Sequence, residues 1–173
     1  MPNSKKICVL GLGYIGLPTA ALLANRGYSV HGVDVVQSTV DTINQGKIHI
    51  VEPELDTFVQ AAVNSGKLKA SLTPTVADVF IIAVPTPFHE GYVPNIDYVV
   101  SATKAIAPYV KEGDIVILES TSPVGTTDLV EDTLKEANID TSKLYIAHCP
   151  ERVLPGHIMR ELVENDRIVG GIT

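Results

Sequence analysis

The feature that most constrains the fold of this chain is the alternation of short apolar segments with amphipathic ones. Five segments have the length and the β-forming residues of strands, at residues 6–10, 30–35, 79–84, 115–118 and 144–147, and residues 79–84 are apolar at every position. Strands that alternate with helices form βα units, in which the strands run parallel. The sequence therefore predicts an α/β domain with a doubly wound parallel sheet, covered by helices on both faces in three layers.

The segments between these strands have the spacing of helices with one buried face. Leu17, Ala20, Ala21 and Ala24 recur at i, i+3, i+4 and i+7, and Gly27 stands where such a helix ends. Further helices are expected at about residues 38–44, 54–64, 97–110 and 130–137. Weaker signals for a sixth strand and for an edge strand lie at residues 69–72 and 167–169.

Composition favours one compact, acidic domain. The chain has 173 residues, of which 45% are hydrophobic, and a formal net charge of −7. With 13 Lys and Arg against 20 Asp and Glu, and no basic run, nucleic acid is not an expected partner. No apolar run approaches the ~18 residues of a membrane span, and the start of the chain lacks an export signal. We therefore expect a cytoplasmic location and no membrane partner.

The cysteines and histidines do not predict a metal site. Cys8 and Cys149 lie far apart without CxxC spacing, so we expect reduced thiols and no disulfide. Cys8 lies within an apolar strand, where a cysteine is usually a small core side chain. Cys149 would be reactive only if a nearby positive charge lowered its pKa, and is otherwise inert. The five histidines show no metal-ligand spacing.

A glycine pattern follows the first strand directly. Gly11, Gly13 and Gly16 form G-x-G-x-x-G at the start of a helix. The first glycine permits a tight turn, the second lets backbone N–H groups approach a pyrophosphate, and the third allows helix and strand to pack closely. The helix N-terminus also favours an anion. A glycine-rich turn that binds nothing is the alternative, and the strand and helix around the pattern favour a Rossmann-type dinucleotide site.

An acidic residue stands where such a site needs one. Asp34 ends the second strand, roughly 20 residues beyond the glycines, where a carboxylate can accept hydrogen bonds from the adenosine ribose hydroxyls. A solvated aspartate at a strand end is the alternative. Because a carboxylate repels a 2′-phosphate and no arginine follows within residues 35–38, NAD is expected rather than NADP.

The loops after the later strands are rich in functional groups, and ligands of open α/β sheets lie beyond the carboxyl ends of strands. Thr86 stands between two prolines and offers a hydroxyl toward a cofactor, although a structural proline turn explains these residues equally well. Residues 119–127 contain five hydroxyls, more than helix capping needs. In residues 148–156, Glu151 and Arg152 are adjacent, and a surface salt bridge is the simplest interpretation of that pair.

Four motifs together resemble the UDP-glucose/GDP-mannose dehydrogenase family, and the resemblance covers the whole chain. They are Gly-Leu-Gly-Tyr-Ile-Gly-Leu-Pro from Gly11, Ala-Val-Pro-Thr-Pro-Phe from Ala83, Glu-Ser-Thr-Ser-Pro-Val-Gly from Glu119, and Cys-Pro-Glu-Arg-Val-Leu-Pro-Gly from Cys149. The last two are most similar to those of members that act on UDP-N-acetyl-D-mannosamine. The family oxidises the C6 alcohol of a sugar nucleotide to a carboxylate in two NAD-dependent steps, through an aldehyde and a cysteine thioester.

The resemblance implies a role for particular residues of this chain. Asp34 would bind the ribose, Thr86 and Thr121 the nicotinamide half, and Thr127 is a further cofactor candidate. The pyrophosphate would be bound by Gly11, Gly13, Tyr14, Ile15 and Gly16.

On the substrate side, Glu151 matches the glutamate that assists acid and base chemistry near the thioester. A partly shielded carboxylate suits that task, because its pKa can be tuned toward neutrality. Arg152 and Val153 match the start of the substrate-contacting segment.

One departure from the family pattern limits what the chain is expected to do. The nucleophilic cysteine lies in a Gly-Gly-x-Cys motif of a later domain, and neither Cys8 nor Cys149 has that context. We therefore expect residues 1–173 to be the NAD-binding domain of a longer enzyme, inactive alone, with the central and C-terminal domains absent. The full-length enzyme is expected to be a homo-oligomer.

Two alternatives stay open at this point. The enzyme class can be correct with another substrate, such as UDP-glucose, UDP-N-acetylglucosamine or GDP-mannose, because the residues that choose the sugar belong largely to the absent domain. The chain can also be a complete NAD-sensing module without catalysis. The missing nucleophile favours the sensor, and the substrate-side residues Glu151 and Arg152 favour the dehydrogenase.

Overall fold

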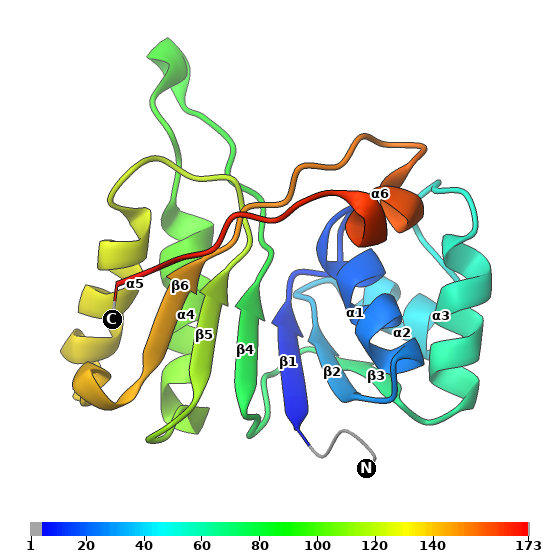
Figure 1. The fold of residues 1–173 in the computed structure, drawn as a ribbon, viewed down its shortest axis with the longest axis horizontal. Helices are drawn as coiled ribbons and strands as arrows, with labels where there is room; N and C mark the ends of the chain where they lie inside the picture. Colours follow the sequence, from blue (N-terminus) through cyan, green and yellow to red (C-terminus); the bar gives the residue numbers. More distant parts are fainter. Residues whose placement is uncertain (1–4, 173) are drawn as a thin grey trace.

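The strands of the computed structural model, which describes residues 5–172, form one sheet in the order β3-β2-β1-β4-β5-β6-β7 (Figure 1). Neighbouring strands from β3 to β6 pair in parallel, and β7 pairs antiparallel with β6. The strand bounds are Lys6–Leu10 for β1, Ser29–Val33 for β2, Leu68–Ser71 for β3, Val79–Ile82 for β4, Ile115–Leu118 for β5, Tyr145–His148 for β6 and Gly170–Gly171 for β7. This order is the doubly wound arrangement that the sequence predicts, with an antiparallel edge added.

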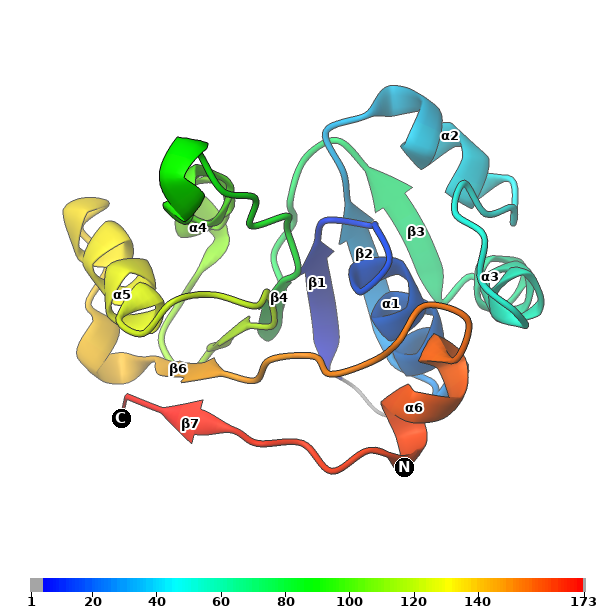
Figure 2. The same cartoon turned by 90° about the horizontal axis from the view of Figure 1, so that it is seen from above.

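Helices cover both faces of the sheet, which gives the predicted three layers (Figure 2). One side chiefly carries α1, α2, α3 and α6, and the other carries α4 and α5. The helix bounds are Gly16–Asn25 for α1, Gln37–Asn44 for α2, Leu55–Asn64 for α3, Asp97–Ile106 for α4, Thr126–Glu136 for α5 and Ile158–Glu164 for α6. Short 3-10 turns lie at Glu90–Tyr92 (η1), Ala107–Tyr109 (η2) and Thr141–Lys143 (η3).

Two apolar cores, one on each side of the sheet, hold these layers together. Along β1, Ile7 and Val9 belong to the core under α1 and α3, whereas Cys8 and Leu10 belong to the core under α4 and α5. Side chains alternate along a strand, so a central strand with helices on both faces must be apolar at every position. The continuous apolar runs of the sequence are therefore explained by burial on both faces.

The structure confirms the five clear strands and the weaker one near residue 70. The predicted edge strand at residues 167–169 is wrong, because the pairing with β6 is made by Gly170 and Gly171. Glycine has little strand propensity, so the pattern pointed to the β-branched residues beside it instead. The sequence also gave no signal for α6, which is short and takes its stability from tertiary contacts.

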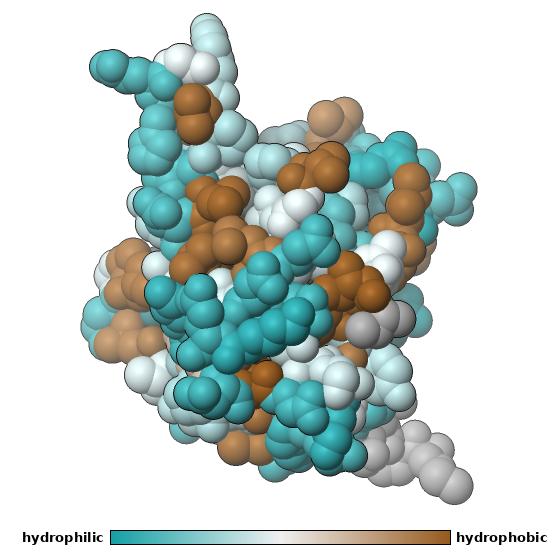
Figure 3. Space-filling view, turned by 90° about the vertical axis from the view of Figure 1, so that its left-hand side faces the viewer, coloured by the Kyte–Doolittle hydropathy of each residue, from teal (hydrophilic) through white to brown (hydrophobic). Residues whose placement is uncertain are grey.

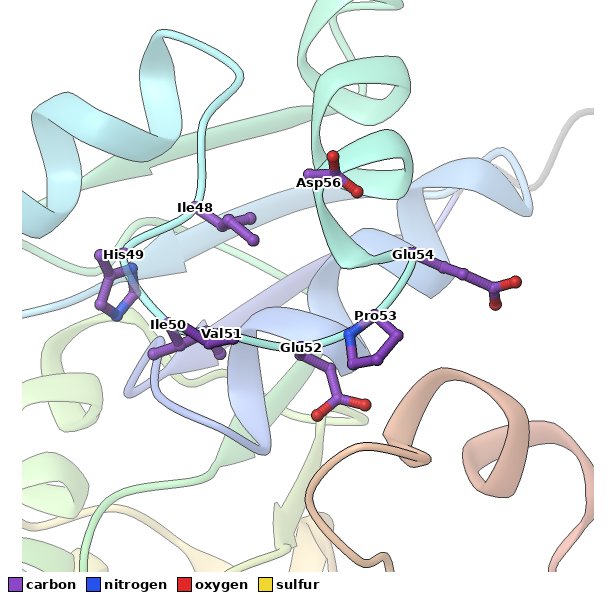
Figure 4. Close-up of a pocket in the computed structure, with 8 residues that line it drawn as sticks. All are labelled: Ile48, His49, Ile50, Val51, Glu52, Pro53, Glu54 and Asp56. Carbon is purple, nitrogen blue, oxygen red and sulfur yellow. The ribbon is translucent and has the colours of Figure 1, made fainter.

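The N-terminus of α6 is held by Glu52, from the loop between α2 and α3. The two carboxylate oxygens of Glu52 accept hydrogen bonds from the N–H of Gly156 at 2.7 Å and the N–H of Ile158 at 2.8 Å. Glu52 is 4% exposed. Figure 4 shows its carboxylate turned toward the segment that leads into α6. One buried carboxylate thus satisfies N–H groups that a helix start leaves without partners.

The segment between β4 and α4 projects from the edge where the parallel strands end. The excursion stands clear of the rest of the domain when seen from the α5 side (Figure 3). Within it, the N–H of His89 donates to the carbonyl of Val93 at 2.8 Å, and the rings of Phe88 and Tyr92 lie 5.6 Å apart. Among residues 5–172, no helix has the length and apolar character needed to cross a membrane.

We predict that Glu52→Gln destabilises the domain by about 1–3 kcal/mol, because an amide can accept only one of the two buried N–H bonds and leaves the other donor unsatisfied. The matched control is Glu54→Gln, two residues away and exposed, which should change stability by less than about 0.5 kcal/mol. Urea unfolding of both variants measures the difference. Equal stability of the two variants would show that Glu52 does not anchor α6.

Candidate functional site

The loops that could bind a ligand gather at the carboxyl ends of β1, β4, β5 and β6 (Figure 1). The chain turns to one side of the sheet after β1 and to the other after β4, and these two strands are neighbours. A crevice forms at such a switch point in open α/β sheets. The glycine turn, Asp34 and the later loops all lie around this edge.

The three glycines of the turn have different structural requirements. Gly11 has a φ of +87°, and a Cβ there would lie 2.5 Å from the carbonyl oxygen of Ala83 at the end of β4. A Cβ on Gly16 would lie 1.8 Å from the carbonyl oxygen of Gly11. By contrast, a Cβ on Gly13 would meet no atom within 4 Å. Packing explains the first and third glycines, and open space in front of the second leaves room for a ligand to approach the backbone.

Asp34 is tied to the glycine turn by its carboxylate. Its Oδ2 accepts a hydrogen bond from the N–H of Leu12 at 3.0 Å, and its Oδ1 accepts one from the N–H of Val36 at 3.0 Å. The side chain is half-buried, so part of the carboxylate faces the crevice. Each oxygen keeps a free acceptor site, which suits the ribose hydroxyls expected from the sequence.

An apolar cavity of about 450 Å³ opens beside Asp34. Its walls come from the ends of β1, β2 and β4, from the loop after β3, and from α4 through Tyr98, Ala102 and Ala105. Binding pockets combine a mostly apolar lining with few polar groups, and here Asp34 and the glycine turn supply the polar side. The cavity has the character expected of a site for a flat, partly apolar ring such as adenine.

A larger depression of about 640 Å³ lies elsewhere, in the loop between α2 and α3 (Figure 4). It is lined by one stretch of the chain, from Ile48 to Glu54, together with Asp56. The buried carboxylate in that stretch, Glu52, already holds the start of α6. The depression is therefore formed by one loop and the start of α3, and size alone does not make it the functional site.

Two of the three threonines expected near the nicotinamide are joined to each other. The hydroxyl of Thr86 donates to the carbonyl of Thr121 at 2.6 Å, which ties the loop after β4 to the loop after β5. Ser120 adds a second tie, to the carbonyl of Val84 at 2.7 Å. Thr127 lies in the first turn of α5. Part of the hydroxyl cluster thus serves to join the loops.

Glu151 has a different partner from the one expected. One carboxylate oxygen accepts the backbone N–H of Arg152 at 2.7 Å, and the other forms an ion pair with Arg167. The Glu151 side chain is only 4% exposed. The expectation of a surface salt bridge with Arg152 is therefore wrong, because folding brings Arg167 to a buried carboxylate. The Arg152 side chain is exposed, and Val153 is half-buried.

Glu119 is a buried acid near Glu151 whose ion pair the sequence did not reveal. It follows β5 directly, is 3% exposed, and pairs with Arg167 at 2.6 Å. Burial raises the pKa of Glu119, and the guanidinium of Arg167 opposes that effect. The sequence does place an acid directly after an apolar strand, which could have indicated a buried carboxylate. Its partner Arg167 is 48 residues away, so the ion pair could not be predicted.

The two thiols lack the environment of a nucleophile. Cys8 is fully buried in β1, as expected, and burial raises its pKa to about 11. Cys149 is half-buried after β6, and burial raises its pKa as well, although Arg167 acts in the opposite direction. A thiol with a raised pKa is neutral near physiological pH and is a poor nucleophile.

Comparison with known proteins identifies the family. Residues 5–173 match the model of the UDP-glucose/GDP-mannose dehydrogenase family, NAD binding domain. The chain belongs to this family. The resemblance seen in the four motifs is confirmed, and so is the expectation of an NAD-binding domain.

Individual members of the family are similar along almost the whole chain. A UDP-N-acetyl-D-mannosamine dehydrogenase of Campylobacter jejuni is 57% identical, and the match covers 100% of this chain and 45% of that protein. An NDP-N-acetyl-D-galactosaminuronic acid dehydrogenase of Ralstonia nicotianae is 56% identical over 98% of the chain and 42% of its own length. The chain thus spans less than half the length of these relatives.

A solved structure agrees with this assignment. The UDP-N-acetyl-mannosamine dehydrogenase Cap5O from Staphylococcus aureus superposes with a TM-score of 0.92 at 45% identity. The superposition covers 97% of this chain and 42% of that one.

The residues of this family member fit NAD. The space before Gly13 leaves the backbone open to a pyrophosphate, the first turn of α1 presents N–H groups, and Asp34 borders the apolar cavity. The assignments of single residues to particular parts of the cofactor stay predictions, for Asp34 and the three glycines as well as for Tyr14, Ile15, Thr86, Thr121 and Thr127.

We predict that Gly13→Ala and Gly16→Ala separate binding from folding. Gly13→Ala should fold normally, because its Cβ meets nothing, yet weaken NAD binding by about 1.5–3 kcal/mol, the scale of one hydrogen bond to a charged group. Gly16→Ala should destabilise the domain, since its Cβ would overlap the Gly11 carbonyl. Calorimetric titration with NAD and urea unfolding measure the two effects. Unchanged affinity in Gly13→Ala would mean that the open face is not the binding face.

We predict that Asp34→Ala weakens NAD binding by a few kcal/mol at most, at ~1.5–3 kcal/mol for each hydrogen bond lost from a charged acceptor. Asp34→Asn keeps acceptor and size without the charge, and should narrow the preference for NAD over NADP. Asp41→Ala is the matched control, because Asp41 is exposed on α2 and its carboxylate contacts Gln37. Titration of each variant with both cofactors tests the assignment, which fails if Asp34→Ala binds NAD as the parent chain does.

Proposed function

We propose that this chain is the cofactor domain of a nucleotide-sugar 6-dehydrogenase. The enzyme oxidises the C6 alcohol of UDP-N-acetyl-D-mannosamine to a carboxylate in two NAD-dependent steps and supplies a precursor for surface polysaccharide. The observation that carries this proposal is the glycine turn with its open Gly13 next to Asp34, in a chain that belongs to this family. The names of the relatives from Campylobacter jejuni and Staphylococcus aureus support the choice of sugar.

The two halves of the site have separate tasks in this proposal. The glycine turn and Asp34 hold NAD, with Thr86, Thr121 and Thr127 on the nicotinamide side, and bound NAD supplies the acceptor for hydride. Glu151 assists proton transfer, and its buried carboxylate lies at the end of β6, two strands away from β4. Arg152 and Val153, in the same loop, form the start of a surface for the sugar nucleotide.

The proposed domain organisation places the nucleophile outside residues 1–173. Both thiols of the chain have a raised pKa, which supports a cysteine in another domain as the group that forms the thioester. The domain would therefore bind cofactor but not turn over alone. A homo-oligomeric full-length enzyme is part of the same proposal.

Other substrates of the same class are the first alternative. The Ralstonia nicotianae relative, at 56% identity, carries a name with N-acetyl-D-galactosaminuronic acid, so this domain is similar in enzymes named for different N-acetylated sugars. UDP-glucose, UDP-N-acetylglucosamine and GDP-mannose belong in the same test. A non-catalytic NAD sensor is the second alternative, and the raised pKa of both thiols favours it, whereas the buried, paired Glu151 favours the dehydrogenase.

The decisive experiment compares two lengths of protein. We predict that the 173-residue chain binds NAD but forms no NADH with UDP-N-acetyl-D-mannosamine, because it lacks an activated thiol. An enzyme in which this domain is joined to a family domain with the Gly-Gly-x-Cys motif should form two NADH per sugar, and should prefer this sugar in a panel that includes the alternatives. Sustained NADH production by the 173-residue chain would overturn the proposal that the nucleophilic cysteine lies in another domain. A preference for another sugar would overturn the substrate.

A further inference from the structure

Three charged side chains from separate segments meet at the carboxyl ends of β5 and β6. Glu119 follows β5, Glu151 lies in the loop after β6, and Arg167 lies between α6 and β7. Both carboxylate side chains are 4% exposed, and the Arg167 side chain is 29% exposed. Two buried anions that share one cation leave an excess negative charge, which a low-dielectric environment makes unfavourable.

The hydrogen bonds of this cluster are unevenly distributed. Oε1 of Glu119 accepts from Nη2 of Arg167 at 2.6 Å and from the hydroxyl of Thr19 at 3.4 Å. Oε1 of Glu151 accepts the N–H of Arg152 at 2.7 Å, and Oε2 pairs with Arg167. Oε2 of Glu119 is buried and has no hydrogen-bond partner among residues 5–172. One of the four carboxylate oxygens is therefore unsatisfied.

The unsatisfied oxygen is the place where a proton disturbs the fewest interactions. A proton on either oxygen of Glu151, or on Oε1 of Glu119, would displace or repel a donor that is already present. A proton on Oε2 of Glu119 displaces none and removes the excess charge, so that one guanidinium faces one carboxylate. Burial, which raises the pKa of Glu119, acts in the same direction. Cys149 also interacts with the cluster, and its raised pKa keeps it neutral.

We propose that Glu119 and Arg167 are positioning residues for Glu151: protonated Glu119 anchors the guanidinium, which in turn holds the Glu151 carboxylate in place. The inference rests on the proposed function, in which Glu151 assists proton transfer. An ionised carboxylate accepts a proton and has none to donate, so Glu151 starts the reaction as a base. The proton that it takes from a substrate hydroxyl or from water then resides on the Glu151 carboxyl group.

The test is a carboxyl-carbon NMR titration of the 173-residue chain labelled at glutamate, with signals assigned through Glu119→Gln and Glu151→Gln. In the parent chain, Glu119 should be protonated at neutral pH. In Arg167→Met, the carboxyl signal of Glu151 at neutral pH should move from its position in the parent chain, because the guanidinium no longer contacts that carboxylate. Glu119→Gln should leave the Glu151 signal in place, because an amide is neutral like the protonated acid.

Two further variants keep the test decisive. Arg160→Met is the matched control, because Arg160 pairs with Glu164 on the exposed surface of α6 and should not affect Glu151. Arg167→Lys keeps the charge if Arg167→Met does not fold. Its compact ammonium lacks the planar fork that reaches two carboxylates, so the Glu151 signal should still move, by less than in Arg167→Met. An unchanged Glu151 signal in the Arg167 variants, or an ionised Glu119 at neutral pH, would overturn the proposal.

The outcome is independent of the test of the proposed function. The titration reports only on the three charged groups and needs no cofactor. NAD binding depends on the glycine turn and Asp34, and Arg167→Met should leave NAD affinity within about twofold, since Arg167 does not line the cavity beside Asp34. Loss of NAD binding by the parent chain would refute the proposed function and leave the positioning of Glu151 intact.

Discussion

The close approach of three backbone segments at the glycine turn is the constraint on which this structure depends. A Cβ on Gly11 would lie 2.5 Å from the carbonyl oxygen of Ala83, directly after β4. A Cβ on Gly16 would lie 1.8 Å from the carbonyl oxygen of Gly11, so neither position accepts a side chain. These contacts place the start of α1 directly above the switch point of the sheet. Because the N-terminus of α1 then faces the crevice, the same packing that closes the core also creates the anion site.

Buried charged groups hold the segment that follows β6 in place. The segment after β6 runs back across the domain to α6 and then returns to pair as β7. Glu52 holds the start of α6, and Arg167 ties the return segment to Glu119 and Glu151. Each anchor joins N–H donors to buried carboxylates, and such interactions are costly to break once water is excluded. They give the loop that carries Glu151 a defined position beside the crevice.

The features that could be predicted from the sequence are those whose residues lie close together along the chain. The glycine turn, its strand and its helix occupy one continuous stretch, and Asp34 follows at the end of the next strand, so spacing alone located them. The central strands β4 and β5 were visible because burial on both faces makes them apolar at every position. The unpredicted parts are α6, the exact edge strand and the partners of Glu151. Each depends on a contact between residues far apart in the chain, such as Glu52 with Ile158 at a separation of 106 residues.

The amino-acid sequence by itself determined the α/β class, the dinucleotide turn and the acid beside it, because periodicity and glycine spacing act over short distances along the chain. Only the tertiary structure decided which charges pair. Arg167 is 48 residues from Glu119 and 16 from Glu151, and no pattern relates them until β5, β6 and β7 lie side by side. Burial then gives these pairs their strength, since charges interact weakly in water and strongly where water is excluded.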